Sequence, residues 1–96
     1  MLSAPEPLDG HPAARVLVVD DEPHITGLLT RMLTHDGHEV LRAETVAAAR
    51  DVIETRTPDI IILDVMLPDS DGITLCQRLK QSAATRLIPV VRLHPV

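Results

Sequence analysis

Two short apolar runs in this chain each end in aspartate, a residue that can hold a cation or attack phosphorus. Residues 16–19 precede Asp20 and Asp21, and residues 60–63 precede Asp64. Uninterrupted β-branched runs of this length are typical of strands buried on both faces of a parallel sheet. Parallel strands end at one edge of their sheet, where open α/β sheets bind ligands, so we expect the three carboxylates to meet there.

Such a cluster predicts a site for a hard cation beside a nucleophile. Two carboxylates about 5 Å apart repel by roughly 3 kcal/mol at an effective dielectric constant of about 20. A bound cation or a raised pKa relieves that repulsion. Oxygen ligands without cysteine or imidazole favour Mg²⁺, and a carboxylate beside the metal can attack a phosphoryl group. The alternatives are that Asp20 and Asp21 only cap a helix and that Asp64 only caps a turn.

The surrounding sequence alternates strand and helix patterns. This order predicts an α/β fold, a doubly wound parallel sheet with right-handed crossovers. Strands are predicted at 15–19, 38–43, 60–63 and 88–93, and helices from Pro23 to Gly37, from Thr45 to about Arg56 and from Gly72 to about Ser82. In each predicted helix, apolar residues recur at the helical period and are expected to face inward. They are Ile25, Leu28, Leu29, Met32 and Leu33 in the first helix, Val46, Ala49, Val52 and Ile53 in the second, and Ile73, Cys76 and Leu79 in the third.

Composition limits the function classes. The 96 residues suffice for one domain, and residues 1–14, rich in proline, are interpreted as a disordered leader ahead of a domain at 15–96. A net charge of −5 and the lack of aromatic residues argue against direct nucleic-acid binding. No apolar stretch is long enough for a membrane span and no signal peptide is present, so the cytoplasm is expected. The single cysteine, Cys76, is interpreted as buried, and His24, His35 and His38 as solvated surface.

The residues around the acids resemble the receiver domain of two-component response regulators. The matching runs are Val-Leu-Val-Val-Asp20-Asp21-Glu22-Pro23, then Ile-Ile-Leu-Asp64 with Pro68 and Gly72 following, then Ile88-Pro89-Val90-Val91. The resemblance covers about Arg15 to Leu93, and the Asp–x₃–Pro–x₃–Gly spacing makes it highly specific. It implies the flavodoxin-like receiver fold, with strand order 2-1-3-4-5.

The resemblance also implies roles for single residues. Asp64 would be the aspartate phosphorylated by a histidine kinase or phosphotransfer protein. Asp20, Asp21, Asp64 and the main-chain carbonyl of Met66 would bind Mg²⁺. Pro68 and Gly72 would shape the loop after the acceptor. Asp69 and Asp71 in that loop need only turn and cap roles. Such a module is not an enzyme.

Two features depart from the family pattern. Receivers continue past the fourth strand with a helix, a fifth strand ending in lysine and a last helix. Here the only lysine is Lys80, on a predicted helix, and we expect a receiver fold truncated after the fourth strand. His94 occupies the switch position where the family has serine or threonine, and we interpret residues 92–96 as a foreign tail. The fourth strand would then be an open edge that favours self-association.

Three hypotheses follow. The leading one is a phosphate-accepting receiver in phosphorelay signalling. The second is an inert or interaction-only receiver fragment that is not phosphorylated. The third is a Mg²⁺-dependent phosphotransferase or phosphatase with Asp64 as nucleophile. It is disfavoured because haloacid dehalogenase-like enzymes carry a second acid two residues after the nucleophile, where this chain has Met66.

Overall fold

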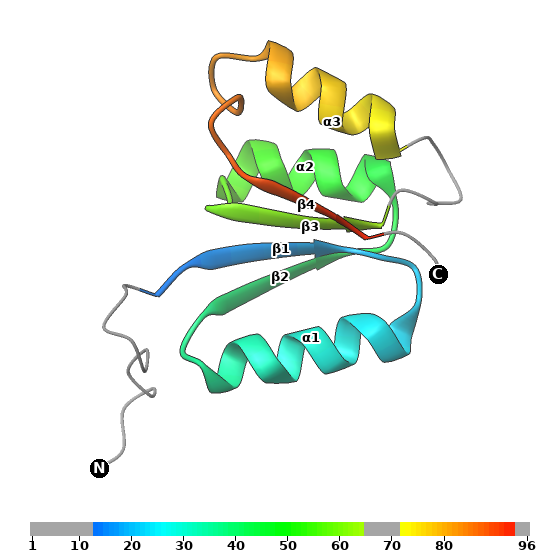
Figure 1. The fold of residues 1–96 in the computed structure, drawn as a ribbon, viewed down its shortest axis with the longest axis vertical. Helices are drawn as coiled ribbons and strands as arrows, with labels where there is room; N and C mark the ends of the chain where they lie inside the picture. The colour runs from blue at the N-terminus through cyan, green and yellow to red at the C-terminus, as the bar shows by residue number, and fades with distance from the viewer. Residues whose placement is uncertain (1–12, 65–71, 94–96) are drawn as a thin grey trace.

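In the part of the chain that the structure describes, four parallel strands form one sheet in the order β2-β1-β3-β4 (Figure 1). The computed structural model describes residues 13–64 and 72–93. The strands are β1 (Arg15–Val19), β2 (Glu39–Ala43), β3 (Ile60–Asp64) and β4 (Val90–Leu93). The predicted doubly wound parallel sheet is therefore confirmed.

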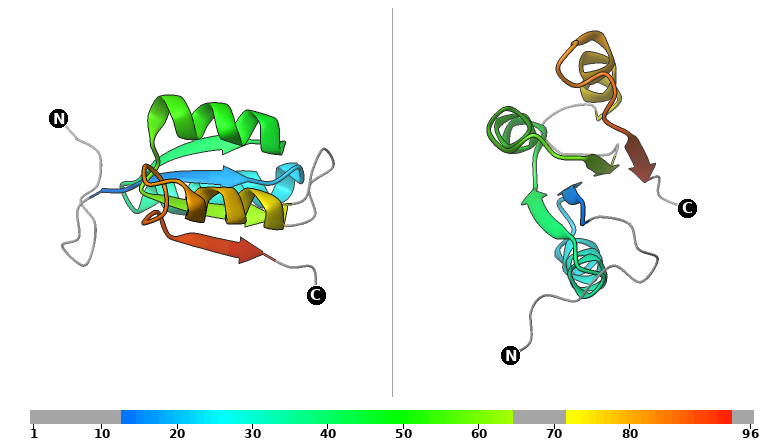
Figure 2. Two further views of the ribbon diagram at one scale, coloured as in Figure 1. Left: turned by 90° about the horizontal axis from the view of Figure 1, so that it is seen from above. Right: turned by 90° about the vertical axis from the view of Figure 1, so that its left-hand side faces the viewer.

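Helices cover both faces of this sheet, but unequally. They are α1 (Pro23–His35), α2 (Val46–Arg56) and α3 (Gly72–Gln81). α2 and α3 lie on one face, and α1 is the only described helix on the other (Figures 1 and 2). The strand-to-helix alternation produces this arrangement, because each parallel strand must be reached by a crossover.

The ends of the helices follow from individual residues. The carboxylate of Glu22 caps α1 by accepting a hydrogen bond of 3.1 Å from the His24 N–H. Thr45 caps α2 by accepting a 3.1 Å hydrogen bond from the Ala48 N–H. Gly37, with φ of 89°, follows the end of α1, since glycine adopts this conformation without strain.

The main core lies between the sheet and the pair α2 and α3. Alternate strand residues point to this side, and Leu17, Val19, Ile61 and Leu63 are fully buried there. Helix residues complete the same cluster; they are Val46, Ala49, Ile53, Leu75, Cys76 and Leu79. The predicted inward positions of α2 are confirmed, with Val52 only partly buried, and so is the burial of Cys76. The burial of Leu75 was not predicted.

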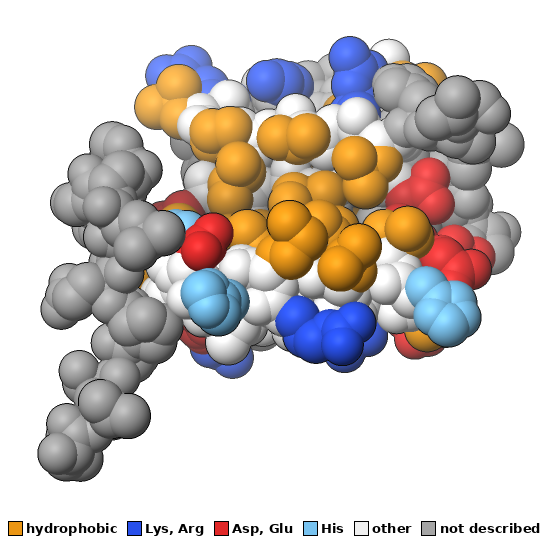
Figure 3. All heavy atoms as spheres, turned by 60° about the horizontal axis from the view of Figure 1, so that its bottom comes forward, with side chains coloured by type: hydrophobic (Ala, Val, Ile, Leu, Met, Phe, Trp, Pro, Cys, Tyr) orange, Lys and Arg blue, Asp and Glu red, His pale blue; other side chains and the backbone are white. Residues whose placement is uncertain are grey.

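The prediction that the apolar stripe of α1 is inward was wrong for three residues. Ile25, Leu28 and Met32 are 40%, 49% and 56% exposed. Strands lie about 4.8 Å apart and a helix is about 10 Å across, so one helix covers about two strands. α1 packs on β1 and β2, and no other described helix lies on that face. Hydrophobic side chains therefore form an uncovered band beside α1 (Figure 3).

Smaller corrections concern single residues. Ile73 on α3 is 42% exposed rather than buried. The fourth strand begins at Val90, not Ile88, because the Ile88 N–H bonds the Thr85 carbonyl in the preceding turn. The second begins at Glu39, not His38. His38 is also not solvated as predicted: its ring accepts a 3.0 Å hydrogen bond from the Ala14 N–H and is only partly exposed.

Candidate functional site

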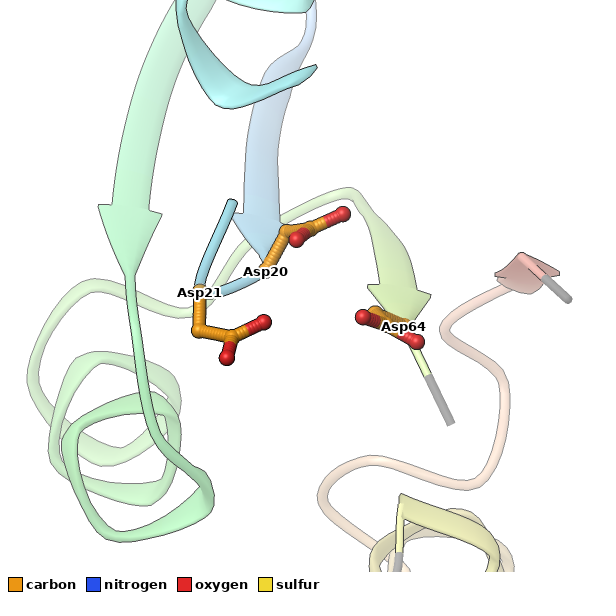
Figure 4. Close-up of side chains that lie close together, drawn as sticks. All are labelled: Asp20, Asp21 and Asp64. Carbon is orange, nitrogen blue, oxygen red and sulfur yellow. The ribbon is translucent and has the colours of Figure 1, made fainter. Parts of the chain in front are cut away.

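The register of β1 and β3 brings the predicted acids together. These neighbours pair in parallel with Val19 opposite Leu63, so Asp20 and Asp64 reach the same edge of the sheet. Asp21 follows directly in the turn toward α1. Each of the three carboxylates offers an oxygen, and these oxygens all lie within 4.8 Å of one another. Figure 4 shows the three side chains around one space at the ends of the two strands.

Hydrogen bonds fix Asp20 in this cluster. Its N–H donates to the Ala43 carbonyl at 3.0 Å, which ties the end of β1 to β2. Its Oδ1 accepts from the Glu22 N–H at 2.8 Å. Asp20 is 5% exposed, whereas Asp21 is exposed and Asp64 is partly buried. The cluster thus opens to solvent on the side of Asp21.

Burial raises the pKa of the Asp20 carboxyl group above its ordinary value. The hydrogen bond from Glu22 lowers this pKa, while the charges of Asp64, Asp21 and Glu22 raise it further. The charged form of Asp20 is therefore destabilised in the folded protein without a counter-ion.

The donor set fits a hard divalent cation. Three carboxylates converge from two elements, and the described residues place no cysteine or histidine among them. Mg²⁺ is bound in proteins by one or two carboxylates and retained water, which this open, oxygen-only cluster can provide. A cation there would also relieve the repulsion that raises the pKa of Asp20.

Sequence reasoning missed two residues beside the acids. Arg42 on β2 donates a 2.9 Å hydrogen bond to the hydroxyl of Thr26, which is 3% exposed. Both line a groove of about 420 Å³ together with Asp20. Thr26 could have been found from the sequence, because it lies four residues after Glu22, the spacing of a helical hydrogen bond. Its N–H donates a 3.1 Å hydrogen bond to the Glu22 carbonyl. Nothing in the local sequence linked Arg42 to it.

Other predicted positions have mixed outcomes. Gly72 is buried and begins α3, next to the predicted loop. Met66, Pro68, Asp69, Asp71 and His94 lie outside the described residues. His24 and His35 are exposed, as predicted.

The fold and site define a class of protein: a doubly wound parallel sheet with three carboxylates at the carboxyl edge of its central strands. The family model for the response regulator receiver domain matches residues 16–93. The chain belongs to this family, the receiver domains of two-component response regulators.

Relatives and solved structures agree with this assignment. The chain is 44% identical over 78 residues to the phosphate regulon transcriptional regulatory protein PhoB of Pseudomonas aeruginosa, with 81% of this chain and 34% of that protein covered. It is 46% identical over 79 residues to response regulator PleD of Caulobacter vibrioides, with 82% and 17% covered. The chain thus spans about a third of the first relative and about a sixth of the second.

Two solved structures show the same fold. The signal receiver domain of a signal transduction histidine kinase from Syntrophus aciditrophicus aligns with a TM-score of 0.82 at 32% identity, with 88% of this chain and 64% of that chain covered. The N-terminal domain of a response regulator receiver protein from Methanoculleus marisnigri aligns with a TM-score of 0.79 at 32% identity, with 84% and 66% covered.

Proposed function

We propose that this chain accepts a phosphoryl group on Asp64, with Mg²⁺, from a histidine kinase or phosphotransfer protein in a two-component phosphorelay. The observation that carries the proposal is the convergence of Asp20, Asp21 and Asp64 within 4.8 Å. Membership of the receiver family supports the choice of partner.

The proposed step is a single phosphoryl transfer. A carboxylate oxygen of Asp64 attacks phosphorus, the bond from phosphorus to the donor histidine nitrogen breaks, and its electron pair remains on the imidazole, which takes up a proton. Asp20 and Asp21, with Asp64 and the carbonyl of Met66, would hold Mg²⁺. The ion, when bound, neutralises charge on the transferring group.

We propose further roles for residues around the acid cluster. Pro68 and Gly72 would shape the loop after the acceptor, and His94 would occupy the switch position. The chain would act as a phosphoacceptor that turns over no substrate, which is the usual behaviour of receiver domains. We also propose that residues 1–14 form a leader and residues 15–96 the receiver unit.

The helices, charge and composition of the chain support a proposal about where it acts and which partners it does not bind. None of the described helices is long and apolar enough to cross a membrane. We propose action in the cytoplasm, without membrane contact. The net charge of −5 and the lack of aromatic residues support a chain that does not bind nucleic acid directly.

Labelling by a small phosphodonor tests the function. The chain is incubated with acetyl phosphate and Mg²⁺ and run on a phosphate-affinity gel beside Asp64→Asn. Asp51→Asn is the matched control, because Asp51 is an exposed acid on α2 away from the cluster. We expect a shifted band for the parent and for Asp51→Asn, and none for Asp64→Asn.

A second candidate is an interaction module that is not phosphorylated. It is supported by β4, which pairs with β3 and with no other described strand. We propose that two copies can associate through this strand. A folded chain that takes no label but forms a dimer in sedimentation would select this function, whereas phosphate release far above stoichiometry would indicate an enzyme.

A further inference from the structure

Two of the three clustered carboxylates come from one short turn. Asp20 and Asp21 lie between the end of β1 and the start of α1, whereas Asp64 belongs to β3 itself. Strand pairing fixes β3 in the sheet, but a turn needs other contacts to hold its shape. The geometry of the acid cluster therefore depends on what holds this β1–α1 turn, residues 20–22.

Adjacent residues of β2 hold the two ends of this turn. At its start, the Ala43 carbonyl accepts the 3.0 Å hydrogen bond from the Asp20 N–H. Just beyond its end, the guanidinium of Arg42 donates a 2.9 Å hydrogen bond to the hydroxyl of Thr26 in the first turn of α1. Successive strand residues point to opposite faces, so Arg42 reaches α1 while Ala43 packs in the core on the other face.

Thr26 connects Arg42 to the acid cluster. Its N–H donates to the Glu22 carbonyl at 3.1 Å, and its hydroxyl donates to the Pro23 carbonyl at 3.2 Å. The Glu22 N–H in turn donates to the Asp20 carboxylate at 2.8 Å. Thr26 is buried, so water competes little for its hydroxyl. A continuous path of hydrogen bonds and backbone therefore runs from Arg42 to Asp20.

Arg42 has two opposite effects on a cation at the cluster. It lines, together with Asp20, the groove of about 420 Å³. Its positive charge there repels a cation, so its removal would by charge alone strengthen cation binding. Its hydrogen bond to Thr26 acts in the other direction, because it holds the turn that carries two of the ligands. A measured change in cation affinity distinguishes the two effects by its sign.

We infer that Arg42 is a positioning residue of the acid cluster. Through Thr26 it fastens the first turn of α1 to β2, which keeps the two acids of the β1–α1 turn beside Asp64. Arg42 itself touches neither the ion nor the phosphoryl group. The inference rests on the proposed function, since it takes Mg²⁺ as the cation of the cluster.

A Mg²⁺ titration of the full chain, followed residue by residue in ¹H–¹⁵N NMR spectra, tests the inference. Arg42→Met removes the guanidinium but keeps a long unbranched side chain, and Thr26→Val removes the hydroxyl but keeps the branched shape. We expect each variant to bind Mg²⁺ about tenfold more weakly than the parent, the lower end of the effect of residues that orient metal ligands. The double variant should bind like Thr26→Val alone, because both changes break the same hydrogen bond.

Two control variants separate hydrogen bonding from charge and from loss of stability. Thr26→Ser keeps the hydroxyl and should bind Mg²⁺ like the parent. Arg31→Met removes the same charge from an exposed site farther along α1 and should bind within about twofold of the parent. A bond with only a structural role would lower the free energy of unfolding of the variants and leave the Mg²⁺ dissociation constant unchanged.

A readout without metal separates this inference from the proposed function. Hydrogen-bonded amides exchange slowly with solvent, and the N–H groups of Asp20 and Glu22 both donate hydrogen bonds. In chelator we expect both amides to exchange about tenfold faster in Arg42→Met and Thr26→Val, and at the parent rate in Arg31→Met. Unchanged exchange at the buried Ala49 and Ile61 would show that the fold is intact.

Three results would overturn the inference. The first is Mg²⁺ binding by Arg42→Met that equals or exceeds that of the parent, which would leave Arg42 a charge effect alone. The second is equal weakening in Arg31→Met. The third is unchanged exchange of the Glu22 amide in both variants. A parent chain that binds no Mg²⁺ contradicts the proposed function instead, and the exchange rates then decide whether Arg42 holds the turn.

Discussion

The main-chain N–H of Glu22 donates a 2.8 Å hydrogen bond to the carboxylate of Asp20. The side chain of Glu22 in turn caps α1. One turn after β1 therefore both starts the helix and orients the most buried acid of the cluster. Asp20 is held in place at the cost of burying a charge beside Asp21 and Asp64.

This geometry predicts that Asp20→Asn stabilises the metal-free chain. Asparagine keeps an oxygen that can accept the Glu22 N–H but removes the buried charge and its repulsion with Asp64. We expect a higher free energy of unfolding in urea with a chelator at neutral pH, and a smaller gain on adding Mg²⁺. A variant less stable than the parent in chelator would contradict this.

The raised pKa of Asp20 predicts the sign of a pH effect. Its pKa lies above the unfolded value of 3.8, so the folded chain binds more protons than the unfolded chain between the two values. The contribution of Asp20 to stability is fully present below 3.8 and is lost as pH rises through the folded pKa. The excess stability of Asp20→Asn in chelator should therefore shrink as pH falls toward 3.8. An excess that grows on acidification would refute this.

The unequal coverage of the sheet predicts opposite outcomes for two leucines. Leu17 is fully buried under α2 and α3, so Leu17→Ala should cost about 2–5 kcal/mol of unfolding free energy. Leu28 on α1 is 49% exposed, so Leu28→Ala should cost less than about 1 kcal/mol. Urea denaturation of both variants measures the difference. Equal losses would mean that the α1 face is covered in solution.

The hydrogen bond that caps the start of α2 predicts the effect of one substitution on stability. Thr45→Ala removes the acceptor of the Ala48 N–H and should cost about 1 kcal/mol. The control is Thr55→Ala within α2, where the hydroxyl only donates to the Asp51 carbonyl and the helix backbone is unaffected. We expect a change within about 0.5 kcal/mol for the control, measured by the same denaturation.

The sequence predicted the order of elements and the acid cluster, because both follow from local patterns. Apolar runs ending in Asp20 and Asp64 needed only the rule that parallel strands end at one edge. The exposure of Leu28 and Met32 could not be predicted, since helical periodicity identifies an apolar face but not how much of the sheet lies opposite it. Arg42 was missed for a similar reason. Its partner Thr26 lies on another element and is reached only through the tertiary fold.

Intact-mass measurement of the chain treated with acetyl phosphate and Mg²⁺ tests whether Asp64 accepts phosphate. We expect a gain of one phosphoryl group, removed by hydroxylamine as expected of an acyl phosphate. The gain should be absent in Asp64→Asn and retained in Asp51→Asn. Equal phosphorylation of Asp64→Asn, or no gain in a folded parent chain, would show that Asp64 is not the phosphoacceptor.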